Sequence, residues 1–117
     1  MMGARDVAIF LRQARYRMGS EYLLQQDVER HLHTAGIPYE REHRLSPGER
    51  LDFLVAGNVA VELKIRAQRK SIYRQLERYA RHEIVQALIL VTASALGMPK
   101  TIEGKPVYIV QLGLTAL

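Results

Sequence analysis

The chain has 117 residues, with seventeen Lys or Arg against twelve Asp or Glu, and it has no cysteine. This length predicts one domain over residues 1–117, and a hydrophobic content of 48% excludes a wholly disordered chain. The lack of cysteine excludes disulfides, thiolate metal sites and cysteine nucleophiles. No apolar run reaches the roughly 20 residues of a membrane helix, and no signal-peptide pattern is present. We therefore expect a cytoplasmic, intracellular protein without membrane contact, and the net charge of +5 suggests a polyanionic partner.

Two helices are predicted at the start of the chain. Residues 4–17 carry apolar side chains at helical spacing with arginines between them, which predicts a basic N-terminal helix within residues 1–18. Ser20 follows Gly19 as an N-cap, and a second helix is expected from about Glu21 to Ala35, ending at Gly36.

The rest of the chain predicts strands around one further helix. We expect an exposed strand from Tyr39 to Leu45, a turn at Ser46-Pro47-Gly48, and a hairpin formed by two strands around Ala56-Gly57-Asn58. The expected elements after residue 50 are strands 51–55 and 59–65, a helix at 71–81, a buried strand at 84–92, a loop at 93–105 and a strand at 107–112.

This order, α-α-β-β-β-α-β-β, predicts an α/β fold with a central mixed β-sheet flanked by helices. The hairpin supplies antiparallel pairing, and the crossover helix allows a parallel neighbour. We expect the core to span about residues 20–112.

The hairpin strands carry charge where an ordinary core strand would not. Val61, Leu63 and Ile65 point to one face of their strand, so Glu62 and Lys64 point to the other, about 7 Å apart. Magnesium prefers carboxylate oxygens, and phosphodiester hydrolysis uses such a cation to activate water and neutralise charge. Asp52 and Glu62 are therefore candidate ligands for Mg²⁺ or Mn²⁺.

The Leu63 backbone carbonyl is a further candidate ligand, and Lys64 could orient or deprotonate the water or stabilise charge on the phosphate. The alternative is that Asp52, Glu62 and Lys64 form a salt-bridge cluster on an exposed sheet face.

The length of the hairpin loop tests this site. A two-residue Gly57-Asn58 turn would pair Asp52 with Leu63, on the wrong face, whereas a three-residue loop would pair Asp52 with Glu62. Because three-residue hairpin loops are common, we predict the loop Ala56-Gly57-Asn58.

Asp52 followed by Glu62-Leu63-Lys64 on a hairpin between two helices resembles the PD-(D/E)xK nuclease superfamily over about residues 20–92. The sequence around these residues is similar to small bacterial or phage members and to Holliday-junction-resolvase-like ones. Leu51 stands at the position of the proline in the family's motif. The resemblance implies a restriction-endonuclease-like core and metal-dependent cleavage of nucleic acid, usually DNA. The matching residues are Glu21, Asp52, Glu62, Lys64 and Gln75.

Two helix residues would support such a site. Glu21 lies near the centre of the apolar stripe of its helix, so it either supports the metal or is a first-turn acid favoured by the helix dipole. Glu29 is the other candidate acid. Gln75 borders the apolar side of its helix and could reach Lys64, and the resemblance implies contact with the substrate backbone or the catalytic acid. The alternative is a boundary glutamine that bonds nearby backbone.

A run of cations follows Lys64 and contains only one acid, Glu77, before Arg81. Such residues would hold phosphates without reading sequence, although a solvated helix face is the alternative. The candidate nucleic-acid contacts are Arg66, Arg69, Lys70, Arg74 and Arg78.

We therefore expect a nuclease with structure-selective or non-specific action, because a domain of this size offers little surface for reading bases. A homodimer would allow symmetric cutting of two strands. The competing hypotheses are a non-catalytic nucleic-acid-binding module on the same fold and a subunit of a larger phage or repair assembly.

Overall fold

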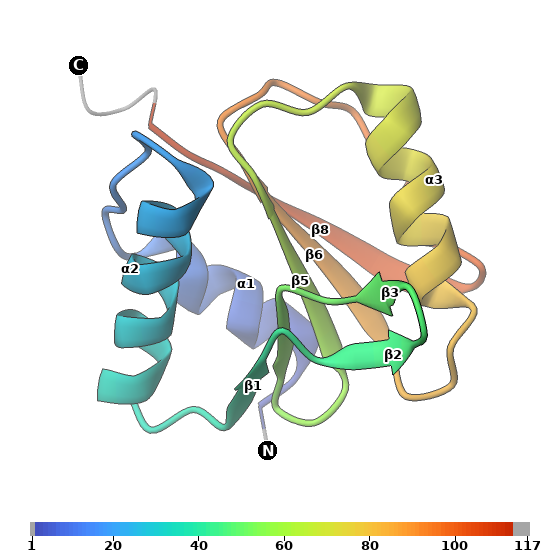
Figure 1. Cartoon of the computed structure of the whole chain (residues 1–117), viewed down its shortest axis with the longest axis horizontal. Helices are drawn as coiled ribbons and strands as arrows, with labels where there is room; N and C mark the ends of the chain where they lie inside the picture. Colours follow the sequence, from blue (N-terminus) through green and yellow to red (C-terminus); the bar gives the residue numbers. More distant parts are fainter. Residues whose placement is uncertain (1, 114–117) are drawn as a thin grey trace.

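The computed structural model describes residues 2–113 and contains a central sheet with helices on both faces (Figure 1). The helices are α1 (Ala4–Arg12), α2 (Glu21–Thr34) and α3 (Arg69–Ala80). The strands are β1 (Tyr39–Arg41), β2 (Arg44–Ser46), β3 (Glu49–Arg50), β4 (Phe53–Val55), β5 (Val59–Lys64), β6 (Ala87–Thr92), β7 (Thr101–Ile102) and β8 (Lys105–Gln111).

The main sheet is mixed, as predicted. Its six strands run in the order β1-β4-β5-β6-β8-β7, while β2 and β3 form a separate two-stranded sheet. β4 and β5 are antiparallel, and the crossover through α3 makes β6 parallel to β5. β8 is also parallel to β6.

The alternation of side chains along β5 separates two apolar cores. Val61 and Leu63 pack with α1 and α2 on one face, whereas Ala60 packs with α3 on the other. Glu62 and Lys64 follow the alternation of Ala60, so they lie on the face that α3 covers. Leu54 packs with the α3 core too, which puts Asp52 on the same face of β4.

The start of α2 agrees with the sequence prediction. The Ser20 hydroxyl accepts a 3.2 Å hydrogen bond from the backbone N–H of Leu23, as an N-cap should. The helix ends at Thr34, and Gly36 follows with a φ of 71°, a left-handed conformation that glycine adopts readily.

The first helix is shorter than the predicted 4–17. It ends at Arg12 because the Leu11 carbonyl, which would accept from residue 15 in a longer helix, accepts a 2.7 Å hydrogen bond from the Tyr16 hydroxyl. The backbone N–H of Arg17 instead donates to Asp27 at 2.7 Å. These long-range contacts hold residues 13–17 in a non-helical path.

The predicted strand from Tyr39 to Leu45 is interrupted, so the expected order of elements needs correction. Glu42 has a φ of 56° and divides the segment into β1 and β2. β2 then pairs with β3 around Pro47 and Gly48, and we call these two strands and their turn the β2–β3 hairpin. The expected loop at 93–105 also contains a strand, β7, which turns through Glu103 and Gly104 into β8.

Candidate active site

The β4–β5 register brings the two predicted carboxylates together. Val55 pairs with Val59 and Phe53 with Val61, so the hairpin loop has the three residues Ala56, Gly57 and Asn58, as predicted. Extending this register by one pair sets Asp52 opposite Glu62. β4 begins at Phe53, so Asp52 lies just before it, where the pairing of β4 and β5 starts.

Asp52 is held by the neighbouring strand. Its Oδ2 accepts a 2.8 Å hydrogen bond from the backbone N–H of Leu63, and its Oδ1 has a longer 3.5 Å contact with the amide nitrogen of Gln25. Burial raises the pKa of Asp52, while the Leu63 N–H and the charge of Lys64 act in the opposite direction. A single well-aligned backbone donor thus fixes one carboxylate oxygen and leaves the other weakly bound.

Glu62 is more deeply buried, with 4% of its surface exposed. Its Oε1 atom is buried and has no hydrogen-bond partner among the described residues. Burial raises the pKa of Glu62 to about 8, and the nearby charge of Asp52 adds to this effect, while Lys64 opposes it. A buried carboxylate oxygen without a partner is costly unless a proton or a cation joins it.

Tyr79 links α3 to this pair, a role that the sequence analysis did not assign. Its hydroxyl accepts a 2.7 Å hydrogen bond from the side-chain amide of Gln75 and donates to the Arg50 carbonyl at 3.1 Å. Burial and the neighbouring Glu62 raise the pKa of Tyr79, so the hydroxyl stays protonated near neutral pH. The sequence signal was its position four residues after Gln75, on the same side of the helix.

The donor set fits a hard divalent cation. Two carboxylates on one face repel each other, and a cation would relieve this repulsion and supply the missing partner of Glu62. Because the N–H of Leu63 faces Asp52, its carbonyl faces the same side of the strand and is a further oxygen donor. Within residues 2–113, however, no group of three acidic, His or Cys side chains lies close enough together to hold a metal.

Glu21 is therefore near the pair rather than part of a tight three-carboxylate cluster. It is half-buried at the first turn of α2, and its negative charge raises the pKa of both Asp52 and Glu62. Glu29, the other candidate acid, is engaged elsewhere. Its carboxylate accepts hydrogen bonds from Arg41 at 2.8 Å and from the Tyr39 hydroxyl at 2.9 Å.

A hollow of about 390 Å³ contains the carboxylates. The β2–β3 hairpin lines it through Arg44, Gly48, Glu49 and Arg50, all of which the sequence analysis missed as site residues. The interruption of the predicted strand at Glu42 is what turns this hairpin over the site. The other residues that line the hollow are Asp52, Glu62, Lys64, Gln75, Arg78 and Tyr79.

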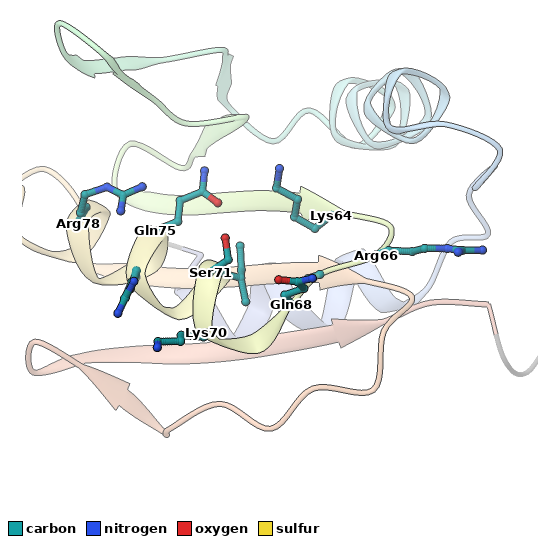
Figure 2. A pocket seen from close by; sticks show the side chains of 10 residues that line it. Lys64, Arg66, Gln68, Lys70, Ser71, Gln75 and Arg78 are labelled. Carbon is teal, nitrogen blue, oxygen red and sulfur yellow. The ribbon is translucent and has the colours of Figure 1, made fainter.

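A second hollow of about 570 Å³ adjoins the first and shares Lys64, Gln75 and Arg78 with it. Figure 2 shows Lys64 and Gln75 projecting to the same side, from β5 and α3 respectively. We call this second hollow the basic groove. Its remaining lining residues are Arg66, Ala67, Gln68, Lys70, Ser71, Ile72 and Arg74.

Four of the five predicted phosphate contacts line the basic groove, and Arg69 does not. The Arg69 side chain instead donates a 2.8 Å hydrogen bond to the Gly97 carbonyl. This contact ties the first turn of α3 to the loop after β6. Arg66 follows β5 and extends away from α3 (Figure 2).

No family model, curated protein or solved structure matches the chain. None of the helices among residues 2–113 is long and apolar enough to cross a membrane.

Proposed function

We propose that the chain is a divalent-metal-dependent nuclease of the PD-(D/E)xK type, with a restriction-endonuclease-like core, that hydrolyses phosphodiester bonds of DNA. One observation carries the proposal. The unpaired buried oxygen of Glu62 lies beside Asp52 in a hollow that continues into the basic groove. Among the described residues neither carboxylate forms an ion pair, and neither do Arg66, Lys70, Arg74 and Arg78 of the basic groove. Such a surface suits a metal and a phosphate chain.

Asp52, Glu62 and the Leu63 carbonyl would hold Mg²⁺ or Mn²⁺, and Glu21 would strengthen the negative field around them. The bound cation would act as a Lewis acid on the phosphate and lower the pKa of a bound water. Lys64 places its ammonium group where the basic groove meets the hollow, so it can orient the water and stabilise charge on the phosphate.

Gln75 lies in both hollows and already donates one amide N–H to Tyr79, which fixes the orientation of its side chain. Its carbonyl oxygen and second N–H have no other hydrogen-bond partner among residues 2–113, and they would contact the phosphate backbone. Arg66, Lys70, Arg74 and Arg78 would bind phosphates along the basic groove without reading bases.

A cleavage panel tests this proposal. Single-stranded, duplex, flapped and four-way-junction DNA, and RNA, would be incubated with Mg²⁺, Mn²⁺ or chelator. We expect metal-dependent cleavage that Asp52→Asn and Lys64→Ala abolish. Cleavage that persists undiminished in both variants would reject the assigned site.

Metal titration separates this proposal from its rivals. Nucleic-acid binding without Mg²⁺ or Mn²⁺ binding would favour a non-catalytic binding module. Metal binding with cleavage only after a partner is added would favour a subunit of a larger assembly. The sedimentation of the active species would show whether it is a homodimer.

A further inference from the structure

The hollow that holds the carboxylates is bounded at one end by the β2–β3 hairpin and the C-terminal half of α3. This end affects how a nucleic-acid strand can reach the carboxylates. Leu51 is fully buried and packs with Leu76 and Tyr79 of α3, so the base of the β2–β3 hairpin is seated on the C-terminal half of that helix. Leu45 from β2 adds to the same apolar contact. These apolar side chains hold the base of the hairpin against α3 at this end.

Two polar contacts close the same end. The Tyr79 hydroxyl donates to the Arg50 carbonyl at 3.1 Å, and His82 Nε2 lies 3.2 Å from a carboxylate oxygen of Glu49. His82 itself is held by Lys105, whose ammonium donates to the His82 carbonyl at 2.8 Å. The hairpin, the end of α3 and the start of β8 are therefore joined behind the site.

The charged side chains also differ between the two sides of the carboxylates. The open side of the carboxylates carries the cations of the basic groove, which continue along β5 and α3 to Arg66. On the closed side, Glu49 faces His82, and Arg50 lies 3.4 Å from Glu42. A strand that passed through the site would need phosphate contacts on both sides of the cleaved bond. The hairpin side offers Arg44 and Arg50 to the hollow, whereas the longer track of cations lies along the basic groove.

Resting on the proposed function, we propose that the substrate is a strand terminus. A strand lies along the basic groove with its end against the β2–β3 hairpin, and hydrolysis removes nucleotides from that end. Water adds to the phosphorus, the bond to the terminal fragment breaks, and the leaving oxygen takes a proton. Arg44 and Arg78, which line the carboxylate hollow, are the cations available to the terminal residue, and Arg78 lines the basic groove as well.

Circular DNA provides the test, because a closed circle has no terminus. The wild-type chain would be incubated with Mn²⁺ and a single-stranded circle, the same circle opened once, and the corresponding closed and linear duplexes. We expect loss of both linear forms, with mononucleotides or short oligonucleotides released from the earliest times, while both circles persist.

Cutting of either circle at a rate comparable to its linear form would overturn the inference and leave the nuclease proposal standing. If neither linear nor circular DNA is cut, the proposed function fails, and the inference fails with it. A linear strand with bulky groups on both ends is the matched control, and it should resist cleavage as the circle does.

Discussion

The backbone N–H of Leu63 donates a 2.8 Å hydrogen bond to the Oδ2 atom of Asp52, where the β4–β5 ladder ends. The aspartate side chain thus takes the place of the next strand residue as the partner of this amide. The bond gives Asp52 a structural role beside its proposed ligand role. A useful substitution must remove the charge and keep the bond.

Asp52→Asn meets this requirement, because the asparagine carbonyl oxygen can still accept from Leu63. We expect the variant to fold, and to lose metal affinity by about 100-fold or more, since even residues that only support metal ligands cost 10–100-fold when changed. Isothermal titration with Mn²⁺ measures the affinity, and melting temperature checks the fold.

Glu83→Gln is the matched control for this experiment. Glu83 is exposed and forms no ion pair among the described residues, so the substitution changes the net charge by the same amount. Equal loss of Mn²⁺ affinity in the two variants would indicate a general charge effect and would contradict a ligand role for Asp52.

The hairpin loop and the shared face of Asp52 and Glu62 could be predicted because they depend on strand alternation and loop length, which are local. The residue at which α1 ends could not be predicted, because it depends on hydrogen bonds from Arg17 to Asp27, which lies in α2. The β2–β3 hairpin was missed for a similar reason. Glu42 adopts a positive φ while its N–H bonds to the Asp52 carbonyl, a contact that no local pattern contains.

The raised pKa of Glu62 predicts a pH dependence. Its pKa rises from 4.5 to about 8 in the folded protein, chiefly through burial and then through Asp52. The folded state therefore binds more protons than the unfolded state between these values, and the stability of the metal-free protein should fall as pH rises across this window. Glu21 also raises the pKa of Glu62, while Lys64 and Tyr79 lower it.

Metal should reverse this trend, because a bound cation replaces the proton on Glu62. We expect Mn²⁺ to raise the melting temperature more at pH 8 than at pH 5.5, and Glu62→Gln to flatten both dependences. A melting temperature of the metal-free wild type that rises steadily from pH 5 to 8 would contradict the assignment to Glu62.

Removal of a groove cation should weaken DNA binding uniformly. Arg74 is exposed and lines the basic groove, so Arg74→Ala is expected to reduce the slope of log K against log salt by about 1. Fluorescence anisotropy at several salt concentrations measures this slope. Arg5→Ala on α1 removes the same charge away from the groove, and an equal change in slope for both variants would argue against a defined phosphate track.

Asp27 offers a test of stability that is independent of the site. It is 8% exposed and accepts hydrogen bonds from the Arg17 guanidinium and backbone N–H, which hold its pKa below the usual range. Because Arg17 is half-exposed, we expect Asp27→Asn to reduce the free energy of unfolding by about 1–2 kcal/mol.

This stabilisation requires the charged carboxylate, so it should be present at neutral pH and be lost as pH falls through the depressed pKa of Asp27. Urea unfolding at pH 7 and at pH 3 measures the difference between wild type and variant. Metal-dependent cleavage by the folded variant should be unchanged. A loss of turnover without a loss of folding would contradict the independence of Asp27 from the site.

Tyr79→Phe tests whether the Tyr79 hydroxyl orients Gln75 or whether the tyrosine ring only packs in the core. The variant keeps the ring in the α3 core and removes both hydrogen bonds of the hydroxyl, so we expect a loss of about 1–2 kcal/mol in the free energy of unfolding. Without this partner the Gln75 amide is free to rotate, and kcat should fall while KM for DNA stays near its wild-type value.

Tyr73→Phe is the control on the same helix, because the Tyr73 hydroxyl forms no hydrogen bond within residues 2–113. If Tyr79→Phe lowers only the melting temperature and leaves kcat unchanged, the hydroxyl serves to hold the β2–β3 hairpin through the Arg50 carbonyl and does not orient Gln75.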